Sequence, residues 1–96
     1  MLEAVQKAMK LAEEYEIPQL LVLATSALRE APNGGKILRR IEETIGQPVT
    51  VLSGVDEARL TFLAARRWYG WDAGRLLVLD IGGGSLEVAM GSDEDP

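Results

Sequence analysis

Residues 75–91 constrain the fold of this 96-residue chain more than any other stretch, because they predict a strand, a glycine turn and a second strand. Residues 76–81 are apolar except at Asp80, too short a run for an independent helix, and closed by glycines, so a buried strand is favoured. Side chains alternate along the second strand, which places Ser85, Glu87 and Ala89 on one face and Leu86, Val88 and Met90 on the other. Acidic and hydroxyl oxygens therefore flank the turn.

The turn itself consists of Gly82, Gly83 and Gly84. Three consecutive glycines remove the Cβ atoms that would keep an anion off the main chain, and they permit the positive φ values that direct successive N–H groups toward one point. Asp80 and Glu87 add the carboxylate oxygens that Mg²⁺ prefers when it is shared between protein and phosphate. The pattern predicts a metal-phosphate site.

Two other phosphate-binding motifs fit this stretch less well. A dinucleotide-binding fingerprint would need glycine where Glu87 stands and a helix after the turn, and a Walker loop would need a Gly-Lys-Ser/Thr sequence that is absent here. The simplest alternative is a tight β-hairpin in which Asp80 and Ser85 only satisfy local N–H groups. From the hairpin alone, both the functional and the purely structural interpretation stay open.

The amino-acid composition limits the kinds of fold and of catalytic group that this chain can have. With 47% hydrophobic and 26% charged residues, the chain is expected to form one small globular domain, with disorder only in the acidic tail, residues 92–96. It has no cysteine and no histidine, so thiolate chemistry is excluded and a general base must be Asp, Glu, Lys or Tyr. No apolar run approaches the ~20 residues that span a bilayer, and no signal sequence opens the chain, so we expect no membrane partner and a cytoplasmic location.

The net charge of −5 disfavours nucleic acids and anionic membranes as partners. It does not exclude a small phosphate pocket, because a metal ion and convergent N–H groups can overcome the charge locally.

The first half of the chain predicts helices alternating with strands. The opening helix carries an apolar stripe and ends at Ile17-Pro18. Residues 19–24 lack polar alternation, which is typical of a parallel strand covered on both faces. A second amphipathic helix is expected to end at Gly46. The inward-facing residues of the two helices are Leu2, Val5, Met9 and Ala12, and Ile37, Leu38, Ile41 and Ile45.

The second half begins with a short strand at residues 48–53. Ser53 then caps a third helix, expected over residues 55–69, whose first turn carries Glu57. An acid in this position is commonly a plain first-turn carboxylate stabilised by the helix dipole. The aromatic residues at the helix end, Trp68, Tyr69 and Trp71, are interpreted as core or domain-contact residues.

The order of elements predicts an α/β fold, with parallel strands joined by crossover helices and followed by a β-hairpin. A two-stranded hairpin needs more sheet to be stable, so we expect the chain to be a fragment of a longer protein.

Three motifs resemble the exopolyphosphatase/guanosine pentaphosphatase family in order and rough spacing. They are residues 24–31 with Asn33, residues 52–60, and residues 80–87. The resemblance implies a partial ribonuclease-H-like (actin-like ATPase) fold in which residues 1–71 form the C-terminal half of one lobe. Residues 72–96 would then supply a linker, the first hairpin of the second lobe and an acidic tail. It also implies Mg²⁺-dependent release of terminal orthophosphate from polyphosphate or guanosine pentaphosphate, and the sequence does not choose between these substrates.

The resemblance also implies a role for each residue that matches the family's motifs. Glu57 would be the catalytic base and Arg29 would contact phosphate. Asp80 and Glu87 would bind Mg²⁺. The phosphate loop would consist of Gly82, Gly83, Gly84 and Ser85. Leu86 stands where the family usually has Thr, and Asp56 stands where a Glu is common. The family's first phosphate loop has no counterpart here, so the fragment alone is expected to be inactive.

Two other functions are compatible with this superfold, namely a nucleotide-binding kinase or switch and a catalytically silent regulatory domain. The motif around Glu57 favours a hydrolase over a nucleotide-binding kinase or switch.

Unpaired strand edges and an apolar face would invite association with a second chain. We therefore expect a homodimer or higher oligomer, joined through strand edges or by exchange of the hairpin about residues 70–74.

Overall fold

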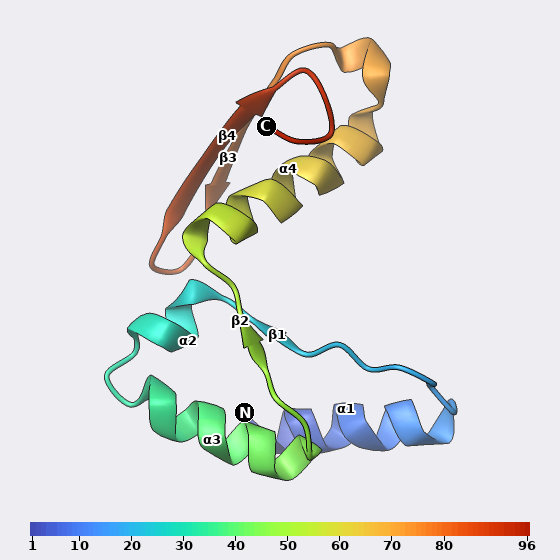
Figure 1. Ribbon diagram of the computed structural model, residues 1–96, viewed down its shortest axis with the longest axis vertical. Helices are drawn as coiled ribbons and strands as arrows, with labels where there is room; N and C mark the ends of the chain where they lie inside the picture. Colours follow the sequence, from blue (N-terminus) through green and yellow to red (C-terminus); the bar gives the residue numbers. More distant parts are fainter. The chain divides into compact units, whose positions relative to one another are not determined.

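The computed structural model describes residues 1–96, and the chain divides into two compact units (Figure 1). Unit 1 comprises Met1–Ala24 and Leu28–Val51, and unit 2 comprises Thr25–Ala27 and Leu52–Pro96. Each unit contains a two-stranded sheet, parallel in unit 1 and antiparallel in unit 2.

Two helices form the body of unit 1. Helix α1, Leu2–Glu14, packs against helix α3, Gly34–Ile45, through the predicted apolar faces. Ile41 and Ile45 are buried, whereas the inward residues of α1 are half-buried. Gly46 ends α3 in the left-handed conformation with φ 73°, which confirms the predicted C-cap.

The strands of unit 1 are shorter than the sequence predicts. Strand β1, Leu23–Ala24, pairs in parallel with β2, Thr50–Val51, so the parallel arrangement is confirmed. The expectation that residues 19–24 are covered on both faces is wrong, since Leu21 is 74% exposed. Next to these short strands, Gln47 Nε2 donates a hydrogen bond to the Leu20 carbonyl at 3.0 Å. In a longer strand, a main-chain N–H group would bind such a carbonyl instead. A five-residue helix not predicted from the sequence, α2, Ser26–Glu30, follows β1.

Unit 2 is organised around α4, Gly54–Tyr69. Ser53 caps it as predicted, because its Oγ accepts a hydrogen bond from the Asp56 N–H at 3.1 Å. The helix ends at Gly70 and is followed by a short 3-10 helix, η1, Trp71–Ala73. Trp68 is 85% exposed and Trp71 62%, so neither occupies a core position in this chain, and the alternative of a domain contact stays a prediction.

The predicted hairpin is confirmed. Strand β3, Leu76–Ile81, pairs with β4, Leu86–Gly91, and Asp80 lies opposite Glu87 in the register. Helix α4 packs on one face of the hairpin, where Ala89 is buried. The other face is open, so β3 is not the fully buried strand that its apolar sequence predicts. The exposed apolar residues of this outer face are Leu77, Leu79, Ile81, Leu86, Val88 and Met90.

Arg66 joins the end of α4 to the hairpin and the tail. Its side chain is 1% exposed, and its guanidinium donates to the carbonyls of Asp93 at 3.2 Å, Gly70 at 3.2 Å, Gly74 at 2.5 Å and Gly91 at 3.2 Å. The acidic tail, for which disorder was expected, therefore packs on α4. Ion pairs with Arg59 and Arg67 also hold the tail at 3.5 and 3.6 Å, but they are exposed and contribute little.

Helix α4 belongs to the same compact unit as the hairpin, so the units divide the chain after Val51. The predicted lobe boundary near residue 71 concerns a longer protein and stays a prediction. None of the helices has the length and apolar character needed to cross a membrane.

The contact between α2 and the start of α3 can be tested with neighbouring glycines. A Cβ at Gly34 would fall on the carbonyl oxygen of Leu28, whereas a Cβ at Gly35 would meet no atom within 4 Å. We expect Gly34→Ala to lower the free energy of unfolding by about 3 kcal/mol or more, because a backbone carbonyl cannot move aside cheaply. The matched Gly35→Ala variant should raise it by about 0.5–1 kcal/mol, since alanine favours the helix. Urea unfolding of both variants checks this, and equal effects would contradict it.

Candidate functional site

Asp80 and Glu87 form a pair of carboxylates on the face of the hairpin that packs on α4. They are direct cross-strand partners, and both are half-buried. Directly opposed side chains lie on the same face with Cβ atoms about 5 Å apart, where two like charges repel each other. A cation near both carboxylates would relieve this repulsion.

The donor set suits Mg²⁺ in one respect. Two carboxylates supply hard oxygen ligands, and Mg²⁺ commonly takes one or two of them together with waters and substrate phosphates. No group of three or more acidic side chains is gathered in the structure. The residues thus fit a shared metal-phosphate site and do not fit a cage made of protein ligands alone.

Asp80 is also bound from α4. Thr61 Oγ1 donates a hydrogen bond to Asp80 Oδ2 at 3.1 Å, which joins the middle of the helix to the end of β3. Thr61 was not among the predicted site residues.

The glycine turn differs from the prediction in one respect. Its main chain closes through a hydrogen bond from the Gly82 N–H to the Ser85 carbonyl at 3.0 Å. The expected positive φ values are absent, since the positive-φ glycines of this chain are Gly46, Gly70 and Gly74. A Cβ at Gly83 or Gly84 would meet no atom within 4 Å. Neither the backbone nor the packing of this chain therefore requires glycine at these two positions.

Glu57 lies in the first turn of α4 and is half-buried. Its Oε2 accepts a hydrogen bond from the Ser26 N–H at 3.1 Å, and Ser26 is 4% exposed. This contact joins two of the sequence motifs, residues 24–31 and residues 52–60. One carboxylate oxygen is thereby held, which is more than a plain first-turn acid requires.

Arg29 lies in unit 1, in the last turn of α2, and its side chain is exposed. It lines a hollow of about 230 Å³ together with Gly34, Gly35 and apolar residues of α3 and β2. The remaining predicted residues all belong to unit 2.

Within unit 2, Glu87 lines a hollow of about 410 Å³ with Ser53, Gly54 and Val55 at the start of α4. The Glu87 carboxylate and the positive end of the α4 dipole therefore face the same hollow.

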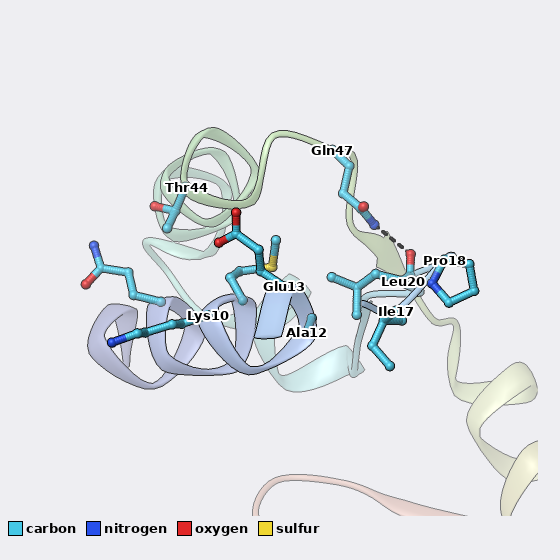
Figure 2. A pocket seen from close by; sticks show the side chains of 10 residues that line it. Lys10, Ala12, Glu13, Ile17, Pro18, Leu20, Thr44 and Gln47 are labelled. Carbon is cyan, nitrogen blue, oxygen red and sulfur yellow. Dashed lines mark hydrogen bonds between the residues drawn. The ribbon is translucent and has the colours of Figure 1, made fainter. Parts of the chain in front are cut away.

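Another hollow, of about 670 Å³, lies in unit 1 and contains none of the predicted residues. Figure 2 shows it lined by Lys10 and Glu13 of α1 and by Thr44 of α3, with the Gln47 side chain hydrogen-bonded to the Leu20 carbonyl. It offers no constellation of catalytic groups.

Sequence reasoning missed two residues, Thr61 and Arg66. Thr61 follows Glu57 by four positions, so both lie on one face of α4. Arg66 follows the buried Phe62 by the same interval, and an arginine in line with a core residue is the signal that could have identified it.

Comparison with known proteins gives consistent likenesses along the whole chain. Exopolyphosphatase 1 of Mycobacterium leprae is 54% identical over 87 residues, which are 91% of this chain and 26% of that protein. The crystal structure of an exopolyphosphatase-like protein matches with a TM-score of 0.82 at 35% identity, covering 96% of this chain and 29% of that one. A crystal structure of the Aquifex aeolicus Ppx/GppA family member matches with a TM-score of 0.73 at 30% identity, covering 94% of this chain and 29% of that one.

These likenesses confirm the predicted α/β class and the partial ribonuclease-H-like (actin-like ATPase) fold. The chain spans between a quarter and a third of the length of these relatives. The family model described as the Ppx/GppA phosphatase family matches residues 1–96. The chain belongs to the Ppx/GppA phosphatase family.

Proposed function

We propose that this chain is part of a phosphohydrolase that uses Mg²⁺ and releases terminal orthophosphate from inorganic polyphosphate. Guanosine pentaphosphate is the second substrate to test, since the motifs also resemble those of guanosine pentaphosphatases. The observation that carries the proposal is the anchored carboxylate of Glu57 in the same compact unit as the glycine turn and its two flanking acids.

The proposed reaction is the hydrolysis of a phosphoanhydride bond. A water oxygen attacks the terminal phosphorus, its proton passes to the free oxygen of Glu57, and the P–O bond to the next phosphate breaks. Orthophosphate leaves, and the shortened chain keeps the bridging oxygen. The Ser26 N–H supports this role because it fixes one Glu57 oxygen and leaves the other to accept the proton.

The turn glycines support phosphate binding. Gly83 and Gly84 have space beside them that no part of this chain fills, so an anion could approach their N–H groups closely. Gly82 and Ser85 complete the proposed loop, and the Arg29 guanidinium is proposed as a further phosphate contact.

Asp80 and Glu87 would hold Mg²⁺. The ion would supply positive charge that neutralises the phosphate oxygens and the leaving group. A cytoplasmic location and the exclusion of nucleic acid as a partner stay predictions, which rest on composition and charge.

The activity is tested by replacing Glu57 in the complete polypeptide that carries this segment. We expect Glu57→Gln to reduce kcat for polyphosphate by about 10²–10⁴-fold, because the base is lost. The fold should survive, since the amide oxygen can still accept from the Ser26 N–H. Phosphate release, assayed with polyphosphate, guanosine pentaphosphate and ATP, is the measurement. The 96-residue chain, assayed in parallel, should release little or none.

Phosphate release from ATP alone would favour the nucleotide-binding switch. Release from none of the three would favour a silent regulatory domain, and full activity of Glu57→Gln would remove the base assignment.

The glycine turn allows a test that separates binding from folding. We expect Gly83→Ala to raise the free energy of unfolding by up to about 1 kcal/mol, because no atom lies near the new methyl group and alanine loses less backbone freedom on folding. It should lower kcat/KM for polyphosphate by about tenfold or more, since the methyl group obstructs the approach of phosphate to the main chain. Thermal unfolding measures the stability, and steady-state kinetics of the same preparation measure kcat/KM.

The control for this test is Gly91→Ala. A Cβ there would lie 2.9 Å from Pro96 Cα and 3.2 Å from Phe62 Cζ, so it should reduce stability. A Gly83→Ala variant that loses stability and activity together would indicate a structural role for the turn.

The proposal includes self-association of the 96-residue chain. Six large apolar side chains on the outer face of the hairpin are more than half exposed, and a contiguous patch of this kind favours burial against another chain. We expect sedimentation equilibrium at micromolar concentration to give a dimer or larger species, and Leu79→Lys to shift it toward monomer. The alternative of hairpin exchange is opposed by Arg66, which binds the carbonyls of Gly70 and Gly74 at the expected hinge. A monomer at all concentrations would contradict self-association.

A further inference from the structure

The hydrogen bond between Thr61 and Asp80 has no evident need in the helix itself. A threonine inside a helix commonly turns its hydroxyl to the carbonyl four residues earlier. Here Thr61 Oγ1 instead reaches out of α4 and donates to Asp80 Oδ2 at 3.1 Å. Both residues are half-buried, so water competes only partly for this bond.

The bond restricts a torsion that is otherwise loose. The terminal torsion of an aspartate has a broad energy profile, so an unbound carboxylate rotates easily. Repulsion from Glu87, its cross-strand partner, would turn the Asp80 carboxylate away from the position in which both acids face one point. A donor on Oδ2 opposes this rotation and leaves Oδ1 free to accept from another group or to bind a cation.

The same face of α4 also carries Glu57. Glu57 and Thr61 are four residues apart, which places them one turn, about 6 Å, apart along the helix. Ser26 holds Glu57 at 3.1 Å, and Thr61 holds Asp80 at the same distance. The helix therefore sets the separation between the proposed base and one of the proposed metal carboxylates.

We propose that Thr61 is a positioning residue that orients the Asp80 carboxylate for a divalent cation and fixes it relative to Glu57. In this role Thr61 acts through Asp80. This inference rests on the proposed function for the identity of the reaction, but its central claim, the control of cation affinity by a hydroxyl group, is measured without turnover.

The test uses Mn²⁺ as a probe, titrated into the complete polypeptide and followed by electron paramagnetic resonance. Thr61→Val keeps the branched shape and removes the hydroxyl, whereas Thr61→Ser keeps the hydroxyl and removes the methyl group. We expect the valine variant to raise the Kd for Mn²⁺ by about 10–100-fold, and the serine variant to stay within about threefold of the unchanged protein. Thr61→Ala takes the place of the valine variant if that protein does not fold.

A double-mutant cycle shows whether Thr61 works through Asp80. In an Asp80→Asn background, Thr61→Val should change the Kd by less than about twofold, because the group that it orients is already lost. The same large loss in both backgrounds would overturn the inference, as would a serine variant as weak as the valine variant, which would make the methyl packing responsible. An unchanged Kd in Thr61→Val would overturn it directly.

The kinetic measurement separates this inference from the proposed function. With polyphosphate as substrate, Thr61→Val should need about 10–100-fold more Mg²⁺ for half-maximal activity and recover most of its kcat when the metal is saturating. If the unchanged protein hydrolyses none of the substrates yet binds Mn²⁺ in a hydroxyl-dependent way, the proposed reaction fails and the positioning role of Thr61 stands.

Discussion

The buried guanidinium of Arg66 is the interaction on which unit 2 depends most. Removing a charge from water is costly, and this arginine has no buried carboxylate beside it to offset the cost. Four main-chain carbonyls bind it instead, and the rings of Phe62 and Trp71 lie 5.8 and 5.4 Å from its central carbon. The planar fork of an arginine can serve several acceptors at once, which a lysine ammonium cannot reproduce.

These four carbonyls come from the segment after α4, the end of β4 and the tail. Arg66 thereby fixes the end of the hairpin that is distant from the glycine turn. Near the turn, Thr61 makes the corresponding contact from the same helix. The hairpin is thus held to α4 by polar groups at both ends, with Ala89 buried between them. A small residue there allows the helix and the sheet to approach closely.

The hairpin shows where prediction from the sequence reached its limit. Its strands, turn and alternation could be predicted because they depend on local patterns, as could the caps at Ser53 and Gly46. The orientation could not, because the larger apolar side chains would ordinarily be expected to face the helix. The structure turns the face with Asp80 and Glu87 toward α4 and leaves the apolar face open. That choice depends on contacts made by Thr61 and Arg66, which no local pattern encodes. The exposed tryptophans and the packed tail escaped prediction for the same reason.

The glycines of this chain fall into two groups, those that the packing requires and those that it does not. Gly34 is fixed by the carbonyl of Leu28, and Gly91 by the tail, so a larger residue at either position would disturb the packing. Gly83 and Gly84 have no such neighbour and adopt no left-handed conformation. A glycine in a turn carries an entropic cost on folding of about 0.5–1 kcal/mol relative to alanine, and two in succession carry it twice. Nothing within this chain offsets that cost, so the stability of the chain does not explain these glycines, whereas the proposed binding of an anion to their N–H groups would explain them.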